Sequence, residues 1–150
     1  MKTKKETIEI IKKLKQAYPD ATCSLDFTSP FEMMVSVVLS AQCTDERVNK
    51  TTPNLFEKYN TPEKMSKIRI EELEELIHPC GFYKNKAKNI LAASKILVEK
   101  YKGIVPNTME ELQSLPGVGR KTCIARKPLC ENCPIKEHCN EYIKINANKL

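Results

Sequence analysis

Hydrophobic residues recur at the three- and four-residue spacing of an amphipathic helix along most of this chain. The clearest stripe occupies residues 84–101 and ends just before Gly103, a residue type that favours the end of a helix. Residues 6–18 show the same spacing, with lysines on the opposite face, and Pro19-Asp20 should end that helix. The hydrophobic pattern therefore predicts an all-α protein.

Capping sequences mark where several helices should begin. Ser29-Pro30-Phe31-Glu32 is a capping box with proline at the first helical position, and it opens the most apolar segment, residues 31–39. A strand is the alternative for this segment, but the cap and the length favour a helix. Further helices should begin at Thr44-Asp45, Thr61, Glu71 and Thr108. Pro53 should bend the first of these or make it restart near Phe56.

Composition and charge narrow the choice of partner only a little. The 150 residues are enough for one or two small domains, and 25 Lys and Arg against 19 Asp and Glu give a net charge of +6. This excess suits a polyanionic partner, although many solvated surfaces carry a similar charge. No apolar run approaches the roughly 18–20 residues of a membrane span, and no apolar segment follows the lysine-rich start, so we expect a cytoplasmic protein with no membrane partner.

Seven cysteines suggest metal ligation, because a chain without an export signal is a poor candidate for disulfides. Four of them form the pattern C-x6-C-x2-C-x5-C, at Cys123, Cys130, Cys133 and Cys139. Four thiolates suit either a four-iron cluster or a tetrahedral zinc ion, and the spacing alone leaves both open. The other three, Cys23, Cys43 and Cys80, lie in or beside apolar segments, and we expect them to be buried small side chains.

The turn Pro116-Gly117-Val118-Gly119 separates a short helix from a second helix that should begin at Arg120. Gly117 and Gly119 let the backbone turn sharply and approach a nucleic acid, so that amide groups can meet a phosphate. An ordinary tight turn is the alternative. Arg126 and Lys127, between the first two cysteines of the pattern, would add phosphate contacts. The segment predicts a helix-hairpin-helix that binds DNA without reading its sequence.

Lys121 follows this turn directly. A lysine here can be a surface charge, a phosphate contact, or a nucleophile that attacks a sugar C1′ and forms a Schiff base. Nucleophilic attack also requires a neighbouring group that lowers the pKa of the amine or accepts its proton. From the residues alone, a phosphate contact is the simpler interpretation.

Taken together, these motifs resemble the endonuclease III family, the bacterial DNA glycosylases and abasic-site lyases of base excision repair. The matching segments are residues 39–45, 48–50, 81–87, 115–122 and the cysteine pattern of 123–139. The resemblance implies the helix-hairpin-helix glycosylase fold, with a six-helix domain of residues 20–121 and an iron–sulfur cluster domain of residues 1–19 and 122–150. It also implies that the four cysteines hold a 4Fe-4S cluster rather than zinc, and that the protein is a monomer bound to damaged or abasic duplex DNA.

The resemblance assigns roles to single residues. The family's nucleophilic lysine falls on Lys121, and the glutamine that fills the gap left by an extruded base falls on Gln42. The wedge position, commonly leucine, falls on Phe82. Base extrusion is required because the sugar carbon cannot be reached in a stacked duplex. The alternatives are an exposed polar role for Gln42, a core position for Phe82, and a helix cap at Asp45, which we prefer for that aspartate.

One departure from the family is large. The family segment after the lysine completes the second hairpin helix and carries the catalytic aspartate, whereas here Thr122 runs directly into Cys123, as after an internal deletion. All three aspartates, Asp20, Asp26 and Asp45, precede the lysine. We therefore expect a glycosylase/lyase of damaged pyrimidines with a truncated cluster domain, or else a non-catalytic DNA-binding remnant. The related adenine-excising branch shares the cysteine spacing but lacks this lysine.

Overall fold

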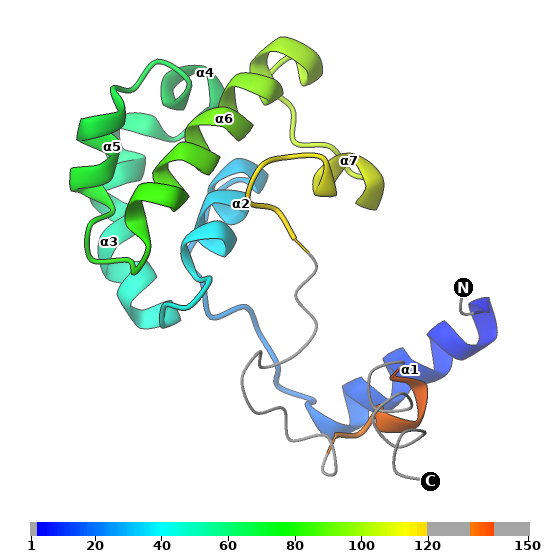
Figure 1. The fold of residues 1–150 in the computed structure, drawn as a ribbon. Coiled ribbons are helices and arrows are strands. Elements are labelled where there is room, and N and C mark those ends of the chain that lie inside the picture. Colours follow the sequence, from blue (N-terminus) through cyan, green and yellow to red (C-terminus); the bar gives the residue numbers. More distant parts are fainter. Residues whose placement is uncertain (1–2, 120–132, 140–150) are drawn as a thin grey trace, which may run out of the picture. The chain divides into compact units, whose positions relative to one another are not determined.

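The computed structural model describes residues 3–119 and 133–139, and every regular element within those ranges is helical. The elements, drawn in Figure 1, are α1 (Lys4–Ala17), α2 (Pro30–Leu39), α3 (Asp45–Tyr59), α4 (Pro62–Met65), α5 (Ile70–Leu76), α6 (Tyr83–Tyr101), α7 (Met109–Gln113) and the 3-10 turn η2 (Lys136–His138). The predicted all-α class is confirmed. Among these helices none combines the length and the apolar character needed to cross a membrane.

The chain divides into two compact units. One consists of Met1–Thr22 with Lys121–Leu150, and the other of Cys23–Arg120. Helices α2 to α7 therefore belong to the second unit, which we call the helical unit, and α1 and η2 belong to the first, which we call the terminal unit. The functional roles predicted for the two domains stay predictions.

The core of the helical unit forms around α6, which packs against α2, α4 and α5, while α3 packs against the same three helices. Its largest fully buried side chains are aliphatic: Leu39, Leu55, Met65, Leu73, Ile77, Ile90, Leu97 and Leu115. Burying each such side chain contributes roughly 1.5–3 kcal/mol, so this core supplies most of the stability of the unit. Leu115 extends the core to the segment that carries the glycine turn.

Side-chain caps fix most of the helix starts. Thr44, Thr61 and Thr108 each accept a hydrogen bond from a backbone N–H in the first turn of their helices, as the sequence predicts. The Oγ of Ser29 likewise accepts from the N–H of Glu32 at 3.2 Å. The Glu32 carboxylate, however, accepts from the N–H and hydroxyl of Thr28, at 2.6 and 2.7 Å, so the reciprocal contact lies one residue earlier than a capping box places it.

For α3, the predicted cap at Asp45 is wrong, and so is one of the two alternatives for Pro53, a restart of the helix. The cap is Thr44, and Asp45 is the first helical residue, whose carboxylate accepts a hydrogen bond from the Ser24 hydroxyl. The helix also continues through Pro53 without restarting near Phe56. Packing explains the continuity, because the buried residues Val48, Thr51, Thr52 and Leu55 hold the helix on both sides of the proline.

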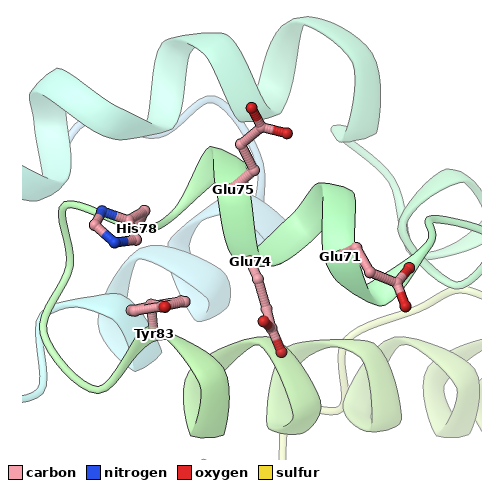
Figure 2. Close-up of a pocket in the computed structure, with 5 residues that line it drawn as sticks. All are labelled: Glu71, Glu74, Glu75, His78 and Tyr83. Carbon is pink, nitrogen blue, oxygen red and sulfur yellow. The ribbon is translucent and has the colours of Figure 1, made fainter.

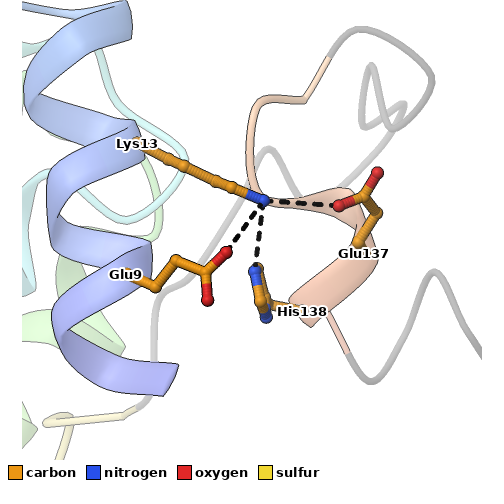
Figure 3. Close-up of polar contacts among 4 residues, drawn as sticks. All are labelled: Glu9, Lys13, Glu137 and His138. Carbon is orange, nitrogen blue, oxygen red and sulfur yellow. Dashed lines mark hydrogen bonds and ion pairs between the residues drawn. The ribbon is translucent and has the colours of Figure 1, made fainter. Parts of the chain in front are cut away.

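In the terminal unit, Lys13 of α1 joins two segments that are far apart in the sequence. Its Nζ lies 3.6 Å from a Glu9 oxygen, 3.3 Å from a Glu137 oxygen and 3.4 Å from His138 Nε2 (Figure 3). Glu137 and His138 belong to η2, between two of the predicted metal ligands. These carboxylates are largely exposed, so the ion pairs orient the segment more than they stabilise it.

Candidate nucleic-acid interface

Gln42 lies in the short connection between α2 and α3, where its side chain is exposed. Its φ is +55°, in the left-handed region that few residues other than glycine adopt. The turn is closed by a hydrogen bond of 3.2 Å from the Cys43 N–H to the Ser40 carbonyl. The backbone is thus folded tightly around a residue whose amide side chain is available to a ligand.

Phe82 occupies the equivalent point between α5 and α6. It is the N-cap of α6, with φ +57° and no side-chain cap, and 67% of the residue is exposed. The alternative of a core role for Phe82 is therefore wrong. A bulky residue at positive φ is an outlier, and such strain gathers at functional sites. Exposure of the ring and strain of the backbone coincide at one residue.

The two loops lie close together. A Cβ placed on Gly81 would lie 3.7 Å from the carbonyl oxygen of Gln42, so any side chain at residue 81 would contact the other connection. A buried lysine on α6 ties the same region together, because Lys86 Nζ donates a 2.8 Å hydrogen bond to the carbonyl of Leu39 at the end of α2. Gln42 and Phe82 are therefore presented by adjacent loops of the helical unit.

Lys86 is not among the site residues that the motifs predict. Its burial could have been predicted from the sequence, because Lys86 precedes Ile90 by four residues and so falls on the apolar face of α6. A lysine on a buried stripe needs an acceptor, and the last carbonyls of a helix are acceptors without a partner in their own helix.

The glycine turn rests on α6. Gly117 has φ +80°, and a Cβ there would come within 2.9 Å of the Asn89 Cβ, so both the conformation and the space demand glycine. The turn is closed by a 3.1 Å hydrogen bond from the Val118 N–H to the Leu115 carbonyl, and Leu115 is buried in the core. A Cβ added at Gly119 would meet none of the described residues within 4 Å. The predicted turn is confirmed as a turn, and its contact with phosphate stays a prediction.

Six predicted site residues lie outside the described residues: Arg120, Lys121, Cys123, Arg126, Lys127 and Cys130. The predicted deletion after Thr122 lies outside them as well. Two of the four predicted metal ligands are described. Cys133 and Cys139 flank η2, are half-buried, and are not joined in a disulfide. Across residues 3–119 and 133–139 no group of three potential metal ligands gathers.

An acidic pocket lies next to the Phe82 loop. It has a volume of about 330 Å³ and is lined by Glu71, Glu74, Glu75, His78 and Tyr83 (Figure 2). The His78 and Tyr83 rings lie beside one another, with centroids 4.6 Å apart and planes tilted by 49°. Three carboxylates around one hollow repel a phosphate backbone, so we do not expect a DNA phosphate to occupy the pocket itself.

An all-α core, a glycine turn that rests on α6 and two exposed positive-φ residues on adjacent loops characterise the helical unit, and the second helix of the predicted hairpin lies outside the described residues. A family model described as "HhH-GPD superfamily base excision DNA repair protein" matches residues 35–143. The chain belongs to this family. The resemblance predicted from the motifs is thereby confirmed.

Curated relatives are named endonuclease III. The protein of Synechocystis sp. is 53% identical over 119 residues, which cover 79% of this chain and 54% of the relative. That of Bacillus subtilis is 50% identical over 110 residues, covering 73% and 50%, and that of Escherichia coli K12 is 43% identical over 119 residues, covering 79% and 56%. The chain spans about half the length of the curated relatives it matches.

Two solved structures resemble this one. A trapped endonuclease III–DNA covalent intermediate, an estranged-adenine complex, superposes with a TM-score of 0.68 at 48% identity, over 80% of this chain and 56% of that one. A non-covalent endonuclease III–DNA complex has a TM-score of 0.68 at 31% identity, over 98% of this chain and 100% of that one. Both contain a helix-hairpin-helix relative together with DNA.

Proposed function

We propose that this chain acts in base excision repair, as a DNA glycosylase and abasic-site lyase on duplex DNA that contains damaged pyrimidines or abasic sites. The observation that carries the proposal is the pair Gln42 and Phe82, exposed at left-handed φ on adjacent loops of a chain from a base excision repair family. A protein with this partner would work in the bacterial cytoplasm, at the nucleoid.

In this proposal the two loops separate a nucleotide from its stack. The Phe82 ring enters the duplex as a wedge, and base–aromatic stacking contributes roughly 1–3 kcal/mol per base. Gln42 occupies the space left by the extruded base and hydrogen-bonds to the orphaned partner through its amide, which both donates and accepts. Extrusion exposes the sugar C1′ to a nucleophile that could not reach it in the stacked helix.

The glycine turn holds the DNA backbone in register. Among the described residues nothing lies within 4 Å of a Cβ added at Gly119, so this side of the turn has room for a phosphate in the proposed contact. Arg120, Arg126 and Lys127 would neutralise further phosphates, and the salt dependence of DNA binding reports such contacts. None of these contacts reads the sequence, which suits a protein that must find damage in any context.

Lys121 is the proposed nucleophile. On damaged DNA its amine attacks C1′ and displaces the base; at an abasic site it adds to the C1′ aldehyde and water leaves, which gives the Schiff base. Loss of a proton from C2′ then expels the 3′ phosphate by β-elimination. A lysine with an ordinary pKa near 10.4 offers about one free amine in 10³ molecules at pH 7. No aspartate follows Lys121 in the sequence to take its proton.

That lack of an aspartate is the specific observation in favour of a second function, DNA binding without base excision. A positioned proton-transfer group typically contributes about 10²–10⁴ in rate, so base excision should suffer most from its loss. Abasic sites are reactive aldehydes and need less assistance. The lack of an aspartate should therefore slow the lyase step less than it slows base excision.

The four-cysteine set would hold a 4Fe-4S cluster. The described pair fits such a group, because Cys133 and Cys139 are half-buried thiols outside any disulfide, on either side of η2. Together with Cys123 and Cys130 they provide four thiolates, the donor set that iron–sulfur clusters use. Bound there, the cluster would brace the segment that contains Arg126 and Lys127, and no step of the reaction depends on it.

Borohydride trapping on an abasic duplex tests the proposal. Only an amine that has formed a Schiff base becomes covalently joined to DNA on reduction, so the unmodified chain should give a protein–DNA adduct and Lys121→Ala should not. Lys95→Ala, at an exposed position on α6, is the matched control and should trap normally. Binding without an adduct would favour the non-catalytic function, and failure to bind either an abasic or an undamaged duplex would contradict both.

A further inference from the structure

Two cysteines outside the predicted metal ligands lie at the two loops that present Gln42 and Phe82. Cys43 directly follows Gln42, and Cys80 directly precedes Gly81. Cys80 is fully buried, Cys43 is half-buried against the same core, and both are free thiols. Cys23, in contrast, is exposed, so the expectation that all three would be buried is wrong for Cys23 and holds fully only for Cys80. Cys23 lies before α2, where no helix covers it.

The two loops bring Cys43 and Cys80 close together. A Cβ added at Gly81 would lie 3.7 Å from the Gln42 carbonyl oxygen, so the residues next to the two cysteines are near neighbours. Cys43 also packs against the buried core cluster that contains Cys80. Burial raises the pKa of the Cys80 thiol, and the neighbouring Cys43 raises it further, whereas Thr51 and Lys86 act in the opposite direction. Cys43, which is half-buried, is the more exposed residue of the pair.

We propose that Cys43 and Cys80 are an oxidisable dithiol that closes to a disulfide between the Gln42 loop and the Phe82 loop. A hydroperoxide oxidises the half-exposed Cys43 thiolate to a sulfenic acid and is itself reduced to the alcohol, or to water in the case of hydrogen peroxide. The Cys80 sulfur then attacks the Cys43 sulfur, the S–S bond forms, the S–OH bond breaks, and water leaves with the Cys80 proton. An external dithiol reverses the reaction by exchange.

The cross-link would act on the fold and on the site. It closes the stretch of chain that contains α3, α4 and α5, and closing a loop of that kind stabilises a protein mainly by restricting its unfolded state. It also fixes the spacing of Gln42 and Phe82. Any effect of the disulfide on DNA binding rests on the proposed function. Formation of the disulfide itself is independent of that function, because it needs no DNA.

Peptide mapping of the full chain tests the proposal. After treatment with hydrogen peroxide, alkylation and trypsin, the peptide of residues 16–47 should be joined to the peptide of residues 70–84, whose sole cysteine is Cys80. The first peptide contains both Cys23 and Cys43, so two variants assign the bond. Cys23→Ser should keep the cross-link and Cys43→Ser should lose it. Both peptides alkylated and unlinked in the peroxide-treated protein, or a link that persists in Cys43→Ser, would overturn the proposal.

Thermal unfolding gives a second readout. The oxidised chain should melt roughly 5–15 °C above the chain reduced with dithiothreitol, since loop closure on this scale acts through the unfolded state. Cys43→Ser should show no such difference, and Cys80→Ala, which keeps an apolar side chain in the core, should behave likewise. An unchanged melting temperature with the link present would remove its stabilising role. Absence of borohydride trapping in the reduced chain, which lacks the link, would instead contradict the proposed lyase function.

Discussion

Phe82 is unfavourable to the folded state in two ways. Its φ of +57° costs an L-residue roughly 1–2 kcal/mol, and 67% of the residue faces water. A residue with only a structural role in that turn would be glycine or asparagine, which adopt this conformation with less strain. Both features favour the proposed role of Phe82, in which its ring enters the gap in the DNA stack.

Replacing Phe82 should separate stability from DNA binding. Phe82→Gly relieves the backbone strain and leaves no cavity, so we expect unchanged or slightly higher stability, by up to about 1 kcal/mol, in chemical denaturation. Affinity for an abasic duplex, measured by fluorescence anisotropy, should fall roughly 5- to 100-fold with the loss of stacking.

Phe27→Ala is the matched control, since Phe27 is also exposed, at 44%, and lies outside the two loops. Its affinity for the abasic duplex should be unchanged. Wild-type affinity in Phe82→Gly, or an equal loss in both variants, would show that the wedge is not at residue 82.

At the scale of elements, the glycine turn depends on α6. Leu115 anchors the end of the segment in the core, and the missing Cβ of Gly117 lets the turn lie against Asn89. Lys86 performs a related task on the same helix, because its amine holds the end of α2. One helix therefore positions the glycine turn and both loops, so damage to its packing should affect all three.

The two glycines of the turn should respond differently to alanine. Gly117→Ala meets a 2.9 Å contact and a φ of +80°, so we expect a loss of roughly 1–3 kcal/mol and a clearly lower melting temperature. Gly119→Ala has open space, and its stability should stay within about 0.5 kcal/mol of the parent. Thermal denaturation of both variants measures the difference. Equal melting temperatures would mean that the turn does not rest on Asn89 in solution.

At the scale of the whole molecule, the terminal unit joins segments from the two ends of the sequence. Lys13 of α1 contacts Glu137 and His138 in the stretch between Cys133 and Cys139. These exposed polar contacts are weak on their own. In the described part of this unit α1 has no buried residue, and a metal cluster at the cysteines would add stability there, since metal binding couples directly to folding.

Metal analysis checks this expectation. Protein expressed in iron-replete medium and purified without oxygen should be brown, absorb broadly at the boundary of the visible and ultraviolet, and contain iron and sulfide. Cys130→Ser should lose most of the iron, and Cys23→Ser should retain it because Cys23 lies outside the ligand pattern. One equivalent of zinc per chain under the same conditions would contradict the cluster.

The sequence by itself determined the helices, their caps at Thr44, Thr61 and Thr108, and the glycine turn. Each of these signals acts over three or four residues, through helical periodicity, a capping hydrogen bond or a sterically permitted φ, and so needs no knowledge of distant segments. The family resemblance could also be inferred from the sequence, because its motifs are residue types at fixed spacings along the chain.

Only the tertiary structure decided what is buried and what lies side by side. Pro53 stays within one helix because packing on both sides of it outweighs the lost hydrogen bond. Phe82 faces water although phenylalanine favours a core, and Lys86 is buried although lysine favours water. Burial and proximity are set by which elements pack together. The loops of Gln42 and Phe82 therefore lie close to each other, together with Cys43 and Cys80, only in the folded chain.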